Sequence, residues 1–249
     1  MRPEALARNL KYVASAAEQP GDPAVTPTVT PAATSASLAR RYAVAWTYLG
    51  CFAIMQVVYA LLDPRTQDTF VAWASTSVTN LEHDPVGCLV VSAFVTGGGV
   101  VGAVVWLPMI ALAMFGAIRA IGVGRTVCVC VAGHVIGTLV SEGIVAWRVD
   151  NRTLPPSYRH LTDVGPSYVV VSALAATLLC GPWLWRLLAA LDLAVLVFAA
   201  RIFGGLTHLD VAAVGHLTAI VTAAIAVPLL AGRFSRPWPY RLRPDRSGR

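Results

Sequence analysis

Six blocks of apolar residues, each 17 to 22 residues long, divide the chain after its first 41 positions. An α-helix rises about 1.5 Å per residue, so about 20 residues cross a hydrocarbon core about 30 Å thick. Only 13% of the residues are charged, which is about half the share of a soluble domain. An apolar soluble helical protein is disfavoured, because its helices would keep a polar face. The sequence predicts an all-α membrane protein with helices at 42–62, 100–118, 126–147, 165–183, 187–203 and 209–230.

The basic residues indicate how the chain is oriented in the membrane. The net charge is +6, and 18 of the 19 basic residues are arginines, a usage typical of a high-GC bacterial genome. If the N-terminus is inside, the inner segments from residue 40 onward hold 11 arginines and the outer segments hold five. This asymmetry predicts cytoplasmic termini in the inner (plasma) membrane of a bacterium. We expect the lipid bilayer, and no nucleic acid, to be the partner of these charges.

Composition divides the chain into a membrane domain and two tails. Residues 1–40 are rich in Pro, Ala, Thr and Ser, and they predict a disordered cytoplasmic tail. The predicted membrane domain covers 41–232, and 233–249 form a basic cytoplasmic tail. The long first loop contains an apolar stretch at 86–95 that is too short to span, so we expect a re-entrant or interfacial segment there.

Polar side chains inside the predicted spans are the candidate functional residues, because burying them in lipid is costly. Ser167 lies near the start of the fourth span, and His216 lies about seven residues into the sixth. Both spans run from outside to inside in the predicted orientation, so the two side chains can share one depth. A histidine that accepts the hydroxyl proton activates a serine as a nucleophile. The pair is a candidate catalytic dyad; alternatively, the serine bonds to backbone and the histidine bridges helices.

Small and polar residues next to Ser167 and His216 support their assignment as a candidate dyad. Gly165 permits a tight turn into the fourth span, and Asp163 can cap the start of that helix. Ala219 and Ala223 share a helix face with His216, where small side chains let a neighbouring helix approach closely.

The third span carries polar residues of its own. The G-x-x-x-G pattern at 133–137 is typical of a close helix contact, so we expect His134 to serve helix packing. Glu142 lies nearer the level of the fourth-span serine. We expect it to partner a polar group such as Arg148 or His216.

Together these motifs resemble the rhomboid family of intramembrane serine proteases. The family has G-x-S-G at the start of its fourth helix, matched here by Gly165-Pro166-Ser167-Tyr168. It also has a sixth-helix histidine followed by small residues, matched by His216 with alanines at +3 and +7, and a long first loop, matched by 63–99. The resemblance covers roughly 42–231 and implies a six-transmembrane-helix rhomboid-like bundle.

The chain also departs from the rhomboid pattern. Tyr168 stands where the family has glycine, and the second-helix H-x-x-x-N, whose residues help bind the oxyanion, would fall near Val104 and Pro108. The family's glutamate between the second and third helices has no counterpart near Arg119. A lost oxyanion donor costs on the order of 10²–10³ in rate. His134 could in principle replace the lost oxyanion donor, but by residue count it lies about 20 Å below the outer end of its span.

The resemblance implies an intramembrane serine protease that cleaves transmembrane protein substrates, with Ser167 attacking the carbonyl and His216 moving the proton. No metal and no organic cofactor is implied. The first alternative is a pseudoprotease that binds membrane-protein clients without cutting them, as the lost H-x-x-x-N suggests. A small transporter ranks lower, because the sequence shows no internal repeat.

Overall fold

The computed structural model describes residues 39–96 and 98–233. These residues belong to the second of two compact units, Ala39–Arg249, and the first unit, Met1–Leu38, lies outside them. The two predicted tails, at 1–40 and 233–249, therefore fall almost entirely outside the described residues.

The described part of the chain is helical throughout, as predicted, and contains no strand. The α-helices in chain order are α3 (Ala43–Leu61), α4 (Pro64–Ala74), α5 (Val78–His83), α6 (Pro85–Ser92), α7 (Gly99–Ile121), α8 (Val123–Asp150), α9 (Ser167–Cys180), α10 (Trp183–Phe198) and α11 (Val211–Arg233). Two short 3₁₀ helices, η1 (Pro156–His160) and η2 (Leu206–His208), lie in the loops before α9 and α11.

Four helices in the described residues are long and apolar enough to cross a membrane: α3, α7, α8 and α11. The predicted count of six spans is not confirmed, because the other two predicted spans form shorter helices. α9 has 14 residues and α10 has 16, so they are about 21 Å and 24 Å long. A hydrocarbon core is about 30 Å thick.

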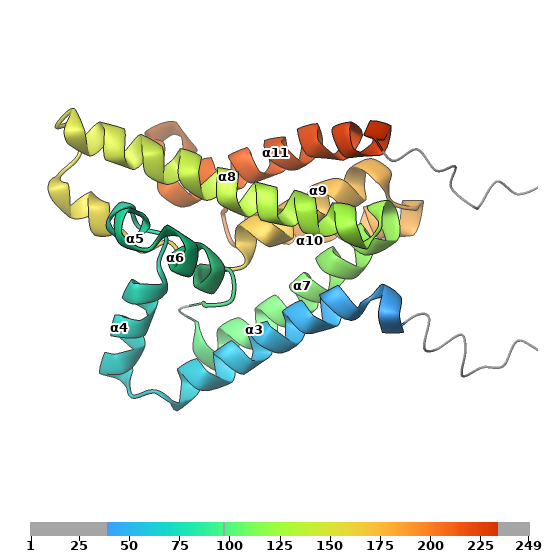
Figure 1. The fold of residues 1–249 in the computed structure, drawn as a ribbon, viewed down its shortest axis with the longest axis horizontal. Coiled ribbons are helices and arrows are strands. Elements are labelled where there is room, and N and C mark those ends of the chain that lie inside the picture. Colours follow the sequence, from blue (N-terminus) through green and yellow to red (C-terminus); the bar gives the residue numbers. More distant parts are fainter. Residues whose placement is uncertain (1–38, 97, 234–249) are drawn as a thin grey trace, which may run out of the picture. The chain divides into compact units, whose positions relative to one another are not determined.

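The short helix α9 occupies the centre of this unit. It packs against α7, α8, α10 and α11, and the run from Tyr168 to Thr177 is buried throughout. A helix that is apolar on all sides is stable when other helices surround it. α11 lies along both α8 and α9, and α3 lies along α7 (Figure 1).

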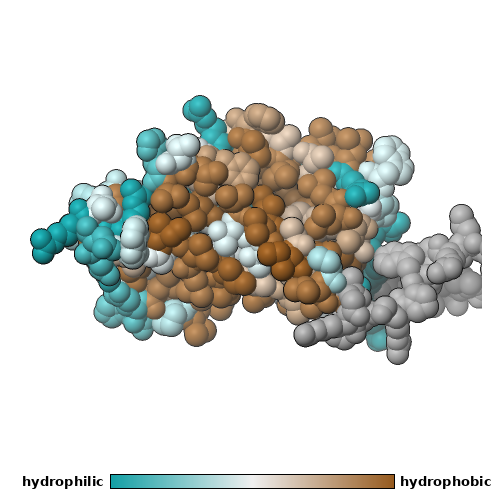
Figure 2. Space-filling view, turned by 90° about the horizontal axis from the view of Figure 1, so that it is seen from above, coloured by the Kyte–Doolittle hydropathy of each residue, from teal (hydrophilic) through white to brown (hydrophobic). Residues whose placement is uncertain are grey.

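The outer surfaces of the long helices are apolar. Exposed side chains include Val57 and Leu61 on α3, Val104 on α7, and Leu139 on α8. Figure 2 shows hydrophobic residues across the middle of one face and hydrophilic residues gathered toward its two ends. This distribution suits a hydrocarbon core bounded by two polar interfaces, so the protein is a multi-pass membrane protein.

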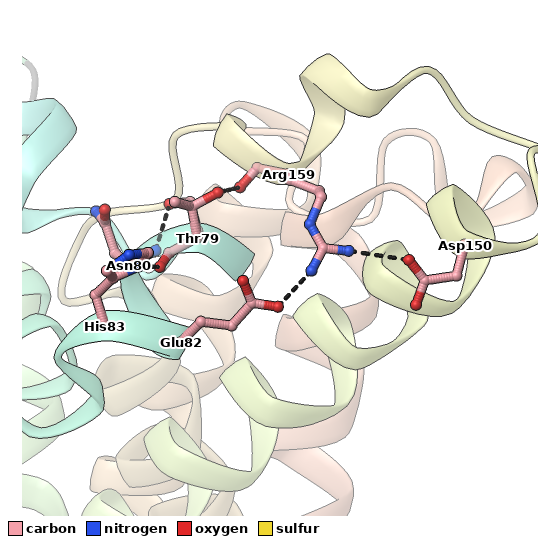
Figure 3. A network of polar contacts seen from close by, with 7 residues as sticks. Thr79, Asn80, Glu82, His83, Asp150 and Arg159 are labelled. Atoms are coloured by element: carbon pink, nitrogen blue, oxygen red, sulfur yellow. Dashed lines mark hydrogen bonds and ion pairs between the residues drawn. The ribbon is translucent and has the colours of Figure 1, made fainter.

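The long first loop forms the three helices α4, α5 and α6. The eight-residue helix α6 covers most of the apolar stretch at 86–95 that was predicted to be too short to span. An arginine from η1 holds α5 in place: Arg159 pairs with Glu82 of α5 and, at 3.0 Å, with Asp150 at the end of α8 (Figure 3). The Arg159 carbonyl also accepts a hydrogen bond from the Thr79 hydroxyl at 3.1 Å. The first loop is thus joined to the loop that precedes α9.

Candidate functional site

The turn into α9 is held by residues of the first loop. The Gly165 N–H donates to the Ser92 carbonyl at 2.9 Å. The Asp163 N–H donates to the Ser75 hydroxyl at 2.8 Å, and the Asp163 carbonyl accepts from the Thr76 N–H at 2.9 Å. Gly165 has a φ of +135°, which side chains other than glycine rarely adopt. The predicted need for glycine at this turn is confirmed.

We expect Gly165→Ala to destabilise the protein by about 1–3 kcal/mol, because alanine is strained at this φ. The measurement is the free energy of unfolding in detergent. Gly143→Ala is the matched control: Gly143 is an exposed helical residue with nothing near the added Cβ, so that variant should be neutral or stabilised by up to about 1 kcal/mol. Equal effects at the two positions would contradict the assignment of strain to Gly165.

Asp163 does not cap α9, contrary to the prediction. The N-cap residue is Pro166, and no side chain caps the helix. The Asp163 carboxylate instead accepts a hydrogen bond from the Tyr168 hydroxyl at 2.9 Å. Burial raises the pKa of this carboxyl above its ordinary value, and the bond from Tyr168 acts in the opposite direction. The backbone bonds to the first loop explain why the carboxylate faces the tyrosine, because they set the direction of the chain at Asp163.

His216 lies on α11 with one ring nitrogen bonded. Its Nδ1 lies 3.2 Å from the Ile202 carbonyl. Because a carbonyl only accepts, the neutral ring carries its proton on Nδ1 and leaves Nε2 as a base. Nε2 is buried and has no hydrogen-bond partner among the described residues.

The side chain that lies against His216 is Tyr168. The two rings meet edge to face, with centroids 4.9 Å apart and planes at 81°. Ser167, the first residue of α9, is half-buried. Consecutive side chains on a helix point about 100° apart, so Ser167 does not share the direction of Tyr168. No hydrogen bond joins Ser167 to His216 in the described part of the chain, and the catalytic dyad stays a prediction.

Glycines make the space that Tyr168 occupies. A Cβ added to Gly215 of α11 would lie 2.1 Å from the Tyr168 hydroxyl, and one added to Gly137 of α8 would lie 3.6 Å from the Tyr168 ring. Tyr168 is 3% exposed, so its ring fills the contact between α8 and α11. The sequence showed Tyr168 only as a departure from a motif. The available signal was the pair of glycines on two neighbouring helices, which leave room for one large side chain.

The predicted close approach of α8 to its neighbours is confirmed. A Cβ at Gly133 would lie 1.9 Å from the Ser172 hydroxyl oxygen of α9, and one at Gly137 would lie 3.0 Å from the Gly215 carbonyl. Ala219 packs here as expected, with its Cβ 3.5 Å from the position of a Gly137 Cβ. These helices approach closely because each presents a small residue to the other.

His134 lies in the contact between α8 and α6. Its Nε2 lies 2.8 Å from the Leu89 carbonyl and 3.4 Å from the Ser92 hydroxyl, and these bonds tie α8 to α6. Its ring centroid is 6.1 Å from that of Tyr168. His134 also lines an apolar groove of about 270 Å³ formed by side chains of α3, α6, α7, α8 and α9.

Glu142 has neither of the partners expected for it. The residue is 2% exposed, and its carboxyl interacts with the backbone of Val78 at the start of α5. Arg148 instead donates to the His208 carbonyl at 2.7 Å.

A cavity of about 450 Å³ opens beside Asp163. It lies between the end of α8, the loop before α9 and the start of α11. Its polar or charged lining residues are Arg148, Tyr158, Thr162, Asp163, His208 and Asp210. We call it the outer cavity, because the predicted orientation places it on the external side.

The fold and the site define a class: a multi-pass helical membrane protein whose short central helix carries a buried tyrosine packed against a histidine of α11. A family model described as rhomboid-like protein matches residues 37–236, and the chain belongs to this family. No curated protein and no solved structure matches the chain.

Proposed function

We propose that this rhomboid-like protein binds transmembrane segments of other membrane proteins and does not hydrolyse them. The observation that carries the proposal is the contact between the Tyr168 and His216 rings, at 4.9 Å between centroids. A serine needs its base within hydrogen-bond reach to become a nucleophile. Here a buried phenol ring packs against the base. The absence of the H-x-x-x-N side chains at Val104 and Pro108 supports the same function.

The apolar groove offers a surface for such a client. It is lined almost entirely by apolar side chains, among them Val90 of α6 and Val131 of α8, which are each 56% exposed. Transmembrane helices associate through close van der Waals packing, because lipid tails are as apolar as their side chains. A groove of about 270 Å³ allows a client helix to insert side chains.

Site-specific photocrosslinking tests client binding. A photoreactive residue at Val131, inside the groove, should yield several-fold more crosslinks to membrane proteins than one at Val221. Val221 is a matched control, because it is an exposed valine on α11 with 47% exposure and does not line the groove. Equal yields from both positions, or crosslinks to lipid alone, would count against the proposal.

The second candidate function is hydrolysis of membrane proteins by Ser167 and His216. The unprotonated Nε2 of His216 favours it, because that atom is the one a general base needs. For this function the Ser167 hydroxyl must come within hydrogen-bond distance of Nε2, an atom that has no hydrogen-bond partner in the described part of the chain.

Fluorophosphonate labelling separates the two functions. We expect the purified protein to remain unlabelled at concentrations that label an active serine hydrolase, because His216 Nε2 makes no hydrogen bond to Ser167 in the described residues. The measurement is gel fluorescence, with Ser167→Ala as the control. Labelling of the wild type that is lost in Ser167→Ala would establish a reactive serine and reverse the order of the two functions.

We also propose that both termini are cytoplasmic and that the protein lies in the bacterial inner membrane. The support is the arginine asymmetry of 11 inner to five outer residues. In this orientation Arg119 and Arg125, beside the turn from α7 to α8, face the cytoplasm. Alkaline phosphatase fused after Arg119 should be inactive, and activity there would reverse the orientation.

A further inference from the structure

Charges of both signs line the outer cavity without pairing with each other. Arg148, in the last turn of α8, and Asp210, just before α11, are both lining residues. The ion pairs found within the described residues are those of Arg159 with Glu82 and Asp150, so the Arg148 guanidinium and the Asp210 carboxylate do not neutralise one another. A cavity that holds separated charges of both signs is complementary to a ligand that itself carries both signs.

The guanidinium of Arg148 is held in a fixed place beside the cavity. One of its N–H groups donates to the His208 carbonyl at 2.7 Å, which directs the side chain from α8 toward η2. An arginine has five N–H donors in a rigid fork that matches the oxygens of a phosphate. In the part of the chain that the structure describes, Arg148 pairs with no carboxylate. Its remaining donors can therefore bind a phosphate group of a ligand.

The two acidic groups of the cavity differ in their surroundings. Asp163 is half-buried, and its carboxylate accepts a hydrogen bond from the Tyr168 hydroxyl at 2.9 Å. Asp210 is exposed, and its carboxylate lies over Gly205, where an added Cβ would be 1.7 Å from Oδ2. The glycine therefore leaves the room that this carboxylate occupies. Asp210 is the acid of the cavity that a cationic group can reach from solvent.

The outer cavity lies at the depth of the lipid headgroups. The helix α8 has 28 residues. It is therefore about 42 Å long, which is about 12 Å more than the thickness of a hydrocarbon core. Its last turn, which carries Arg148, reaches the polar interface. Trp147 in the same turn is 64% exposed, and exposed tryptophans gather at this level of a membrane.

The rest of the lining is apolar and includes a leucine with a strained backbone. Leu209 has a φ of +59°, which is a left-handed conformation that leucine rarely adopts. Its side chain is 44% exposed, so burial in a core does not offset this strain. Strained residues are retained mostly where function needs them. The other apolar lining residues are Val145, Leu154, Leu161, Val211 and Ala212.

We propose that the outer cavity binds the headgroup of a phospholipid that carries both a phosphate and a primary ammonium, the chemistry of phosphatidylethanolamine. The phosphate accepts hydrogen bonds from Arg148, and the ammonium donates to Asp210. Leu209 and its apolar neighbours contact the glycerol and the first carbons of the acyl chains. A lipid is the favoured occupant because the cavity lies where headgroups are always present. This site does not depend on client binding or on hydrolysis.

Lipid titration of the delipidated full chain in detergent tests the proposal. Short-chain phosphatidylethanolamine should raise the unfolding midpoint at lower concentrations than phosphatidylglycerol with the same chains, because the second headgroup has no ammonium. Arg148→Gln should weaken phosphatidylethanolamine binding by about tenfold, the usual loss for a hydrogen bond to a charged group. Arg152→Gln is the matched control, because Arg152 is an exposed arginine just past α8 that does not line the cavity; it should keep the wild-type affinity.

Two further variants separate headgroup recognition from general lipid binding. Asp210→Asn should weaken phosphatidylethanolamine binding but not phosphatidylglycerol binding, so the preference between the two lipids should disappear. Leu209→Asn should weaken both lipids equally. It should leave the lipid-free protein at least as stable as the wild type, because asparagine adopts a positive φ more readily than leucine. Both side chains are exposed, so these variants decide the matter if Arg148→Gln does not fold.

Several results would overturn the site. These are equal wild-type affinity for the two lipids, equal losses in Arg148→Gln and Arg152→Gln, and a lipid preference that survives in Asp210→Asn. Glycerophosphoethanolamine, which has the headgroup without acyl chains, should bind much more weakly than the lipid. Binding as tight as that of the lipid would assign the cavity to a soluble zwitterion. A wild-type protein that binds neither lipid would leave the cavity to a peptide and would likewise overturn the proposal.

Discussion

Gly215→Ala is expected to destabilise the folded protein by about 3 kcal/mol, at the upper end of the usual cost of overpacking. The added Cβ would lie 2.1 Å from the Tyr168 hydroxyl and 2.2 Å from the carbon that carries it. The tyrosine cannot simply rotate away, because it is 3% exposed and packs between α8 and α11. The measurement is the free energy of unfolding by denaturant in mixed micelles.

A double-mutant cycle identifies the contact behind that loss. In a Tyr168→Ala background the Gly215→Ala substitution should cost less than about 1 kcal/mol, because the ring that it would meet is gone. Gly143→Ala is the control in both backgrounds, since a Cβ there meets nothing. If Gly215→Ala costs the same with and without the tyrosine, the clash with Tyr168 is not its cause.

Tyr168→Ala is expected to cost about 3–5 kcal/mol, the range for removing a large buried aromatic side chain. The substitution leaves a cavity where α8, α9 and α11 meet, and it removes the edge-to-face contact with His216. It also removes the hydrogen bond to Asp163 at 2.9 Å. The measurement is again the free energy of unfolding.

Tyr168→Phe separates the hydroxyl from the ring. It should cost about 1–3 kcal/mol, because Asp163 loses a donor inside the protein. Leu179→Ala is a useful comparison: Leu179 is 49% exposed near the end of α9, so truncating it leaves little cavity. A Tyr168→Ala variant no less stable than Leu179→Ala would show that the ring is not a packing element.

The sequence predicted some features of the candidate site and missed others. The reason for each success or failure differs from residue to residue. Gly165 was predictable because a tight turn is a local feature of the sequence. Its φ of +135° is a conformation that favours glycine. The close contact of the G-x-x-x-G pattern was predictable because small residues at helical spacing present a flat surface. Asp163 was predicted to cap α9 and does not, because hydrogen bonds to the first loop set the direction of the chain there.

Apolar block length alone determined that this chain is a helical membrane protein. The number of full-length spans and the neighbour of His216 depended on tertiary structure. Loop residues 75, 76 and 92 hold the chain just before α9, so this helix begins at Ser167 and is short. Once that start is set, the 100° turn between consecutive residues directs Tyr168 toward His216. A shift of α9 by one residue relative to its neighbours would turn a different side chain toward His216, and contacts from distant parts of the chain set that register.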